Sequence, residues 1–416
     1  MVMAGVLVTV AYVLASLGST ARIPARIGPF LAVVLGVLAV AHLATRRLAG
    51  AADPLLLPLA ALLNGLGYVM IARLSDRLAA LQAIWTVVGT VAFVLTVLVV
   101  RRVGDLSRYR WTLLAGAFVM LLLPLLPGLG YSSGGARIWV RLGPVTFQPG
   151  EFAKVALAVF FASYLAERRE LIAARTWRLG PLRLPEPVHL LPIVLAWAGS
   201  VGIMVLQRDL GSSLLFFTLL VVMLWVATDR TAYLVGGFAL FGLAALGAYH
   251  AFDHVQTRVT VWLDPWSDYY GKGYQLAQAS YALAEGGLTG TGLGLGDPQR
   301  IPLAQNDFIF AALGEELGLL GSSLVLVSYL FLVGAGLRAA TRTPRAVESL
   351  LAVGLSTILG VQAFIIIAGV IRVLPLTGVT LPFVSYGGSS LVANYLLLAL
   401  LVRISDTATR RREGWR

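Results

Sequence analysis

The sequence predicts an all-helical protein that crosses a membrane many times, and two observations support this fold class. Hydrophobic residues make up 58% and charged residues 12% of the 416 residues, whereas soluble globular domains contain about 25% charged residues. Apolar stretches of about 17 to 25 residues, each long enough for a helix to cross the hydrocarbon core, recur along the chain. The alternating segments that are typical of a membrane β-barrel do not recur. We therefore expect a polytopic helical membrane protein.

About twelve spans are expected. In chain order they cover residues 2–18, 28–45, 55–72, 80–100, 111–127, 150–167, 189–206, 212–227, 232–250, 308–336, 347–371 and 387–404. The first span lacks the basic segment of a signal peptide, so we expect it to remain as a membrane helix. The span at 308–336 would be about 43 Å long as one straight helix, longer than the roughly 30 Å core. Gly314 and Gly318 are the candidate bends near its start.

Basic residues predict the orientation. With both termini in the cytoplasm, the inner loops carry about 20 Lys and Arg residues and the outer loops about 11, in the direction of the positive-inside rule. The outer segments 128–149, 251–307 and 372–386 then hold most of the Gly, Pro and aromatic residues between spans, so we expect the functional face outside the cytoplasm. The net charge of +12 is interpreted as arginines beside anionic lipid, and no nucleic-acid partner is expected. The absence of Cys excludes disulfides and thiolate metal sites.

The stretch LAQNDFIFAALGEELGLLG, residues 303–321, places three acids beside a long apolar run. Insertion of a carboxylate at mid-bilayer costs about 2.5 to 3.5 kcal/mol of free energy, so a structural or chemical role must account for these acids. Asp307 is either a helix cap or, since partial desolvation raises a carboxyl pKa, a general base. Glu315 and Glu316 are expected at the membrane interface, in structural roles.

Three further segments carry polar residues at the outer ends of spans. In QPGEFAK, residues 148–154, Glu151 and Lys154 share one helix face, as a structural ion pair or as an anion site built on Lys154. In LQRDLGSS, residues 206–213, Arg208 and Asp209 form a surface salt bridge or a site for pyrophosphate or a divalent cation. GLTGTGLGLGD, residues 287–297, lacks the strand and helix of a dinucleotide fingerprint, so we expect a flexible loop.

These segments are joined by GKGYQLAQASYAL at 271–283, GVTLPFVSYGGSSL at 378–391, and Gly135-Ala136 with Trp139 ahead of QPGEFAK. Together and in this order they resemble the SEDS family (shape, elongation, division and sporulation), which includes RodA and FtsW, and the RodA branch is favoured. The resemblance covers about residues 53 to 404. It implies a catalytic core at 51–404 with a large outer loop at 251–307, two additional N-terminal helices at 1–50, and a basic cytoplasmic tail at 405–416.

The resemblance implies a peptidoglycan glycosyltransferase of the bacterial cytoplasmic membrane, for cell elongation or division. It would polymerise lipid II into a lipid-linked glycan at the outer face, with a class B penicillin-binding protein as partner. The family's functional residues fall on Asp307, Glu151, Lys154 and Asp209. Substrate contacts are expected from the remaining polar and aromatic motif residues, namely Arg137, Trp139, Gln148, Gln207, Arg208, Ser385 and Ser389.

The chain departs from the family pattern at three places. Gln305-Asn306 replaces the usual His-Thr before the essential Asp, Arg208 replaces a Pro, and Ile138 stands where an Arg is common. No cofactor is required by the sequence, and no His/Cys metal cluster exists. A loosely held Mg²⁺ or Mn²⁺ near Asp307, Asp209 or Glu151 is the open alternative.

The expected chemistry assigns Asp307 to deprotonate the acceptor GlcNAc 4-hydroxyl, a step that general bases accelerate by about 10²- to 10⁴-fold. Lys154, with Arg208, would stabilise the leaving pyrophosphate. The alternatives are a lipid II flippase or proton-coupled carrier, which needs ionisable groups near mid-bilayer, and a non-catalytic scaffold for a penicillin-binding protein. The clustering of candidate residues at the outer ends of spans favours catalysis.

Overall fold

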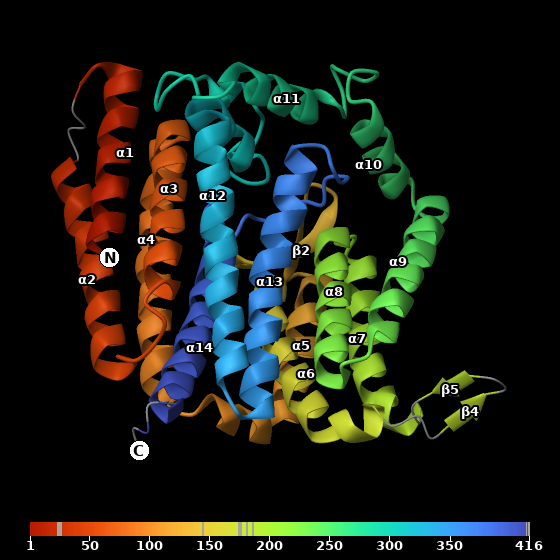
Figure 1. Ribbon diagram of the computed structural model, residues 1–416. Coiled ribbons are helices and arrows are strands. Elements are labelled where there is room, and N and C mark those ends of the chain that lie inside the picture. The colour runs from red at the N-terminus through yellow and green to blue at the C-terminus, as the bar shows by residue number, and fades with distance from the viewer. Residues whose placement is uncertain are drawn as a thin grey trace. The chain divides into compact units, whose positions relative to one another are not determined.

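The fold is built almost entirely from helices (Figure 1). The computed structural model describes residues 1–22, 27–143, 145–173, 177–179, 182–184, 187–412 and 414. Its helices are α1 (Val2–Thr20), α2 (Ile27–Leu48), α3 (Leu56–Leu74), α4 (Asp76–Val99), α5 (Arg110–Leu122), α6 (Gly150–Ala173), α7 (Pro187–Leu206), α8 (Leu210–Thr228), α9 (Thr231–Ala251), α10 (Asp253–Leu263), α11 (Tyr274–Gly286), α12 (Ile309–Arg342), α13 (Ala346–Val370) and α14 (Gly388–Arg412).

The prediction of a polytopic helical membrane protein is confirmed. Within the described residues, 10 helical segments are long and apolar enough to cross a membrane. Helices α2 and α6 occupy the other two predicted spans. Helix α6 has Glu151 and Lys154 in its first turns and the charged run Glu167–Glu170 near its end, which lowers its mean hydropathy.

The chain forms two compact units, each collected from distant parts of the sequence. The first contains Met1–Val99, Ala248–Ala335 and Gln362–Val402, and the second contains Val100–Gly247, Gly336–Val361 and Arg403–Arg416. Residues 413, 415 and 416 of the predicted basic tail lie outside the described residues.

In the first unit, α1 packs along α3 (Figure 1). The contact is close because Val8 of α1 sits over Gly65 of α3, where an added Cβ would lie 2.1 Å from the Val8 Cγ2 atom. Val8, Ala11 and Ala15 form a buried cluster with Val69. Small residues at a membrane helix interface allow such approach of the two backbones.

Helix α12 bends at one of the two predicted glycines. Gly318 has φ 67° and ψ −170°, a conformation outside the helical region, and Gly314 shows no such departure. The bend brings Gly318 against the backbone of another segment, since an added Cβ would lie 2.2 Å from the Gly290 nitrogen. Gly318 therefore combines an unusual dihedral angle with a close backbone contact, and glycine tolerates both. The predicted bend at Gly314 was wrong.

In the second unit, α5 to α8 pack together around a cluster of rings. Trp111 lies 5.4 Å from Phe160 between ring centroids, and Phe160 stacks on Tyr164. The same unit carries a three-stranded antiparallel sheet of β1 (Gly130–Ser133), β2 (Ala136–Leu142) and β3 (Val145–Phe147). Strands β4 (Trp177–Leu179) and β5 (Leu182–Leu184) form a separate hairpin.

No strand was predicted from the sequence, so the small sheet is a correction. Its first turn contains Gly134 and Gly135 with φ 59° and 83°, the positive angles that a two-residue hairpin turn with the favoured twist requires. The Gly-Gly pair between two β-prone runs was the available signal. The strands are only 3 to 7 residues long, much shorter than the apolar runs that predict membrane spans.

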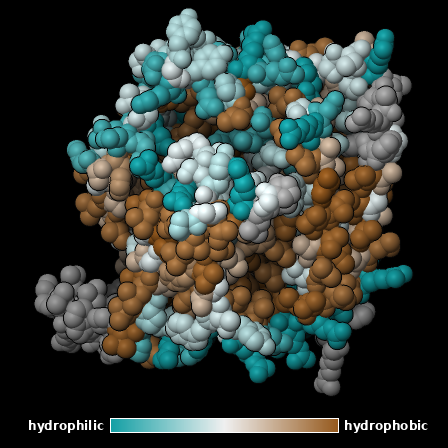
Figure 2. All heavy atoms as spheres, turned by 180° about the vertical axis from the view of Figure 1, so that it is seen from behind, coloured by the Kyte–Doolittle hydropathy of each residue, from teal (hydrophilic) through white to brown (hydrophobic). Residues whose placement is uncertain are grey.

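The outward faces of the helices are apolar. Large hydrophobic side chains such as Val235, Phe238 and Leu243 of α9 are exposed. Figure 2 shows hydrophobic side chains along the sides of the helices and hydrophilic side chains at their ends. Such exposure is unfavourable in water and is the expected pattern where lipid contacts the protein.

Candidate active site

Asp307 lies in the turn just before α12. Its side chain is only partly accessible to solvent. Burial raises the pKa of its carboxyl to about 6, and the Arg258 guanidinium acts in the opposite direction. Helix α12 begins at Ile309, and the carbonyl of the preceding residue, Phe308, accepts from the Ala311 and Ala312 N–H groups, so Phe308 occupies the N-cap position and Asp307 lies one residue before it. A carboxyl with this pKa is suited to accept a proton near neutral pH.

Arg258, on α10, is a candidate that the sequence analysis missed. Its Nη1 atom donates to the Leu376 carbonyl at 3.0 Å. A Cβ added to Gly378, whose φ is 77°, would lie 3.8 Å from Asp307 Oδ2 and 4.0 Å from Arg258 Nη2. The absence of a side chain at Gly378 leaves open space beside both charged groups. The available signal was that Arg258 is one of only three basic residues in the 251–307 segment.

The chain just before Asp307 is fixed by the motif at 378–391. Ser385 Oγ donates to the Asn306 carbonyl at 2.6 Å and accepts from the Leu381 N–H at 2.9 Å. The Tyr386 N–H donates to the Gln305 carbonyl at 2.8 Å. Ser385, predicted as a substrate contact, therefore has its hydroxyl engaged with backbone groups and positions the turn that carries Asp307. Ser389, also predicted, is buried in the first turn of α14.

Two buried polar atoms border this site without a hydrogen-bond partner in the part of the chain that the structure describes. They are Asn306 Oδ1, next to Asp307, and Thr377 Oγ1, next to Gly378. A buried polar atom is unfavourable unless it is paired.

Glu151 and Lys154 form a buried ion pair in the second unit. Lys154 Nζ lies 2.6 Å from Glu151 Oε2, and the two residues are 2% and 4% exposed. The predicted placement on one helix face is confirmed. Each charge stabilises the other in a region from which water is excluded, so removal of one partner alone is costly.

The α7–α8 turn is tied to the sheet of the same unit. The Arg137 N–H donates to the Gln207 carbonyl at 2.9 Å, and Gln207 donates through Nε2 to the Leu121 carbonyl. Asp209 is the N-cap of α8, since its carboxylate accepts from the Ser212 N–H at 3.0 Å. Arg208 is exposed with φ 62°. Asp209 thus has a capping function that neither predicted alternative included.

The other two predicted contacts lie on the same sheet. Trp139, on β2, pairs with Tyr131 of β1 and is partly buried. Gln148 follows β3 directly and leads into α6. The second unit therefore holds the predicted residues of three motifs, and the first unit holds Asp307, Ser385 and Ser389.

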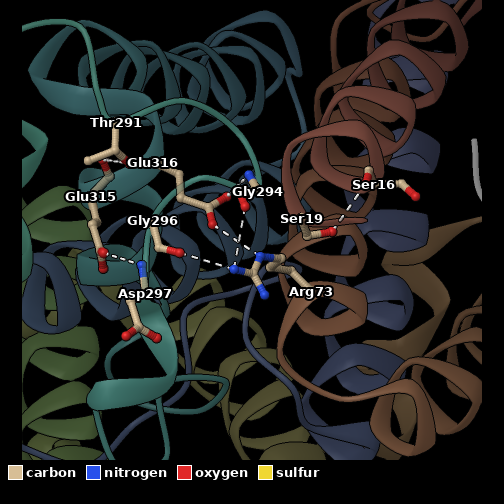
Figure 3. A network of polar contacts seen from close by, with 9 residues as sticks. All are labelled: Ser16, Ser19, Arg73, Thr291, Gly294, Gly296, Asp297, Glu315 and Glu316. Atoms are coloured by element: carbon tan, nitrogen blue, oxygen red, sulfur yellow. Dashed lines mark hydrogen bonds and ion pairs between the residues drawn. The ribbon is translucent and has the colours of Figure 1, made fainter. Parts of the chain in front are cut away.

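Glu315 and Glu316 hold the glycine-rich loop at 287–297 (Figure 3). Glu316 accepts from the Gly294 N–H at 3.0 Å and lies 3.5 Å from Arg73 Nε. Glu315 accepts from the Asp297 N–H at 2.5 Å, and Arg73 donates to the Gly296 carbonyl at 3.0 Å. The loop was predicted to be flexible, but these contacts bind it to α12 and α3. Both acids make structural contacts, and their expected location at the membrane interface stays a prediction.

The same loop touches α1. A Cβ added to Gly18 would lie 2.3 Å from the Leu293 carbonyl, and one added to Gly294 would lie 2.1 Å from the Ala15 carbonyl. Only hydrogen fits between the two backbones at these points, so α1 and the loop are in direct backbone contact.

The described residues do not form a metal-binding site. No group of three or more His, Cys, Asp or Glu side chains there is placed to hold an ion. A loosely held Mg²⁺ or Mn²⁺ stays a prediction.

Comparison with known proteins agrees with the resemblance seen in the motifs. Peptidoglycan glycosyltransferase RodA of Mycobacterium tuberculosis is 46% identical over 381 residues, which cover 89% of this chain and 81% of the relative. A structure described as the structural coordination of polymerization and crosslinking by a peptidoglycan synthase complex is 30% identical, with TM-score 0.71, covering 86% of this chain and 98% of its own. An aspartate-to-alanine variant of RodA from Thermus thermophilus is 28% identical, with TM-score 0.62, covering 85% and 97%.

The predicted glycosyltransferase activity and RodA-like character are confirmed by these relatives. The model of the cell cycle protein family that groups FtsW, RodA and SpoVE matches residues 55–410, so the chain belongs to that family.

Proposed function

We propose that this peptidoglycan glycosyltransferase polymerises lipid II at the outer face of the cytoplasmic membrane, with Asp307 as its general base. The observation that carries the proposal is the setting of Asp307. Its carboxyl has a pKa of about 6, and buried, unpartnered oxygens of Asn306 and Thr377 border it. The excess of Lys and Arg in alternate loops supports the outer location of this site.

The proposed reaction forms one glycosidic bond and breaks one sugar–phosphate bond. The Asp307 carboxylate takes the proton of the GlcNAc 4-hydroxyl of one substrate. The resulting oxygen attacks C1 of the MurNAc at the lipid-linked end of the other, and undecaprenyl pyrophosphate leaves with the bonding electron pair. Asp307 then loses the proton to water. Arg258 keeps the carboxyl ionised at neutral pH, since its charge opposes the effect of burial.

Lys154 is proposed as the cation of the second unit that binds a pyrophosphate group. Glu151, 2.6 Å away, fixes the position of the ammonium group and keeps the pair neutral when no anion is bound. If a loosely held divalent cation takes part, the carboxylate of Asp307, Asp209 or Glu151 would hold it, and it would supply positive charge toward the pyrophosphate.

We further propose a class B penicillin-binding protein as partner, in a complex for cell elongation. The support is the structural similarity to a peptidoglycan synthase complex whose description couples polymerization with crosslinking, together with the high identity to RodA.

The test is polymerisation of purified lipid II by the full chain in nanodiscs, alone and with candidate class B partners. Asp307→Asn should reduce the rate by about 10²- to 10⁴-fold, the usual contribution of a general base. Asp253→Asn is the matched control, since Asp253 is an exposed acid of the same outer segment, and it should retain the wild-type rate.

Strand synthesis by Asp307→Asn at the wild-type rate would remove Asp307 from the mechanism. If the wild type produces no strands with any partner, the polymerase proposal fails, and translocation of lipid II across vesicles becomes the competing activity to measure.

A further inference from the structure

A polar cavity lies in the first unit, and Asp307 is not among its lining residues. Its volume is about 260 Å³, and it is enclosed by α11, the segment 297–301 and the first turns of α12. Three tyrosines, Tyr269, Tyr274 and Tyr281, form part of its wall. We call it the tyrosine pocket. None of the roles described above for catalysis uses it.

The tyrosine rings are fixed in position. Tyr269 meets Tyr274 edge-on with 5.8 Å between centroids, and meets Tyr281 at 6.5 Å. Gln278 Nε2 donates to the Tyr269 hydroxyl at 2.9 Å, and Trp266 Nε1 donates to the Tyr281 hydroxyl at 3.2 Å. Tyr281 is nevertheless 44% exposed. A rigid, exposed aromatic surface binds an amphipathic ligand with little loss of side-chain entropy.

The rest of the pocket lining is polar and mainly acidic. Glu315 is 2% exposed and is held by the Asp297 N–H. Asp297 is paired with Arg300 at 2.8 Å, and Glu285 adds a further carboxylate. Three acids against one arginine disfavour a phosphate or another anion, and this polarity disfavours a lipid chain. An uncharged ligand with many hydroxyl and amide groups is compatible with both the aromatic and the acidic parts of the lining.

A sugar ring has this character. Its C–H faces pack on aromatic rings, and its hydroxyls and N-acetyl group donate to carboxylates and accept from Gln or Arg. The combination of a partly apolar wall with a few fixed polar groups is typical of small-molecule sites.

The position of the pocket relates it to Asp307 within the same unit. Arg300 precedes Asp307 by seven residues, and a chain of that length spans at most about 25 Å. Gln275 of α11 donates to the Pro302 carbonyl at 3.3 Å, which ties the pocket helix to this segment. A glycan of a few sugars that begins at Asp307 can therefore reach the pocket.

We infer that the tyrosine pocket binds an uncharged N-acetylated sugar of the nascent glycan strand as the strand leaves the Asp307 site. The inference rests on the proposed polymerase function for the origin of the strand, whereas the binding itself is independent of turnover.

The test measures binding of a defined probe to the full chain in nanodiscs. The probe is an uncharged, lipid-free tetrasaccharide of four β-1,4-linked GlcNAc residues, and binding is followed by saturation-transfer NMR and calorimetry. Tyr274→Ala and Tyr281→Ala should each weaken binding by about 5- to 30-fold, as truncation of an aromatic contact residue does. Tyr281→Phe keeps the ring and should retain most of the affinity.

The matched control is Tyr270→Ala, because Tyr270 is 94% exposed and does not line the pocket. It should bind the tetrasaccharide like the wild type. In lipid II polymerisation, the two alanine variants of the pocket should produce shorter strands than Tyr270→Ala.

Several outcomes separate the two proposals. If the wild type makes strands but the pocket variants match it in affinity and strand length, the sugar site is wrong and the polymerase stands. If the wild type binds the tetrasaccharide through the tyrosines but makes no strands with any partner, the polymerase is wrong and the sugar site stands. Loss of a transpeptidase partner by the pocket variants, with tetrasaccharide binding unchanged, would reassign the surface to protein contact.

Discussion

Replacement of Arg258 by glutamine should move the acid limb of the pH–rate profile of polymerisation to higher pH. Burial raises the pKa of Asp307 to about 6, and Arg258 is the charge that holds it from rising further. Glutamine keeps a hydrogen-bond donor for the Leu376 carbonyl, which Arg258 contacts at 3.0 Å, and removes the positive charge.

The size of the effect follows from the ionised fraction of Asp307. A nearby opposite charge lowers a carboxyl pKa by about 1 to 3 pH units, and the lower end applies to a partly solvated group. With the pKa moved from about 6 to about 7, the ionised fraction at pH 6 falls about fivefold, whereas at pH 8 it changes by only about a tenth. The variant should therefore be strongly impaired in mild acid and nearly normal in mild alkali.

The assay is the initial rate of lipid II polymerisation between pH 5 and pH 9, with saturating substrate and partner. Lys272→Gln is the control, because it removes one positive charge from an exposed position of the same 251–307 segment. An equal loss of rate at every pH would mean that Arg258 binds substrate and does not tune Asp307. An unchanged limb, or one at lower pH, would refute the assignment of Asp307 as the titrating base.

The remaining predictions concern stability, measured by thermal unfolding in detergent. The pKa of Asp307 in the folded chain, about 6, lies above its reference value of 3.8, so folding disfavours the ionised form. This cost is absent below about pH 4 and complete above about pH 7. The free energy of unfolding of Asp307→Asn should therefore equal that of the wild type in acid and exceed it by about 1 to 3 kcal/mol at pH 8. Equal free energies at pH 8 would contradict the raised pKa. Glu316→Gln removes the carboxylate that balances the charge of Arg73, so the free energy of unfolding should fall by up to about 3 kcal/mol. The double variant with Arg73→Met should recover part of this loss. Strict additivity of the two substitutions would show that the pair does not interact. Gly318→Ala should lower the melting temperature by several degrees, because of its φ of 67° and the 2.2 Å approach to Gly290, whereas Gly236→Ala, with open space around it, should not.

Local patterns predicted the features that depend on neighbouring residues. The spans follow from uninterrupted apolar runs, and the Glu151–Lys154 pair follows from a spacing of three on a helix. Asp307 was found because an acid before a long apolar run is unusual. Each of these signals is contained in fewer than about 30 consecutive residues.

Features that depend on distant contacts were missed. Arg258 is positioned by its hydrogen bond to the Leu376 carbonyl, 118 residues away in the sequence. No sequence pattern near Arg258 predicts that partner. The ordered conformation of the glycine-rich loop also depends on distant contacts, because Arg73 and Glu316, which hold it, lie on two other helices. Composition alone indicated flexibility, which is the expectation for a glycine-rich segment without partners.

The contact between Gly18 and the Leu293 carbonyl has a consequence for how this protein can be divided. A chain that begins at residue 51 would retain every motif on which the family is defined, yet it would lack one wall of the loop that Glu315 and Glu316 hold in place. The segment shared among relatives and the segment needed to support it are thus different pieces of polypeptide. The shortest chain that carries all the motifs therefore leaves one face of the glycine-rich loop without the helix that packs against it.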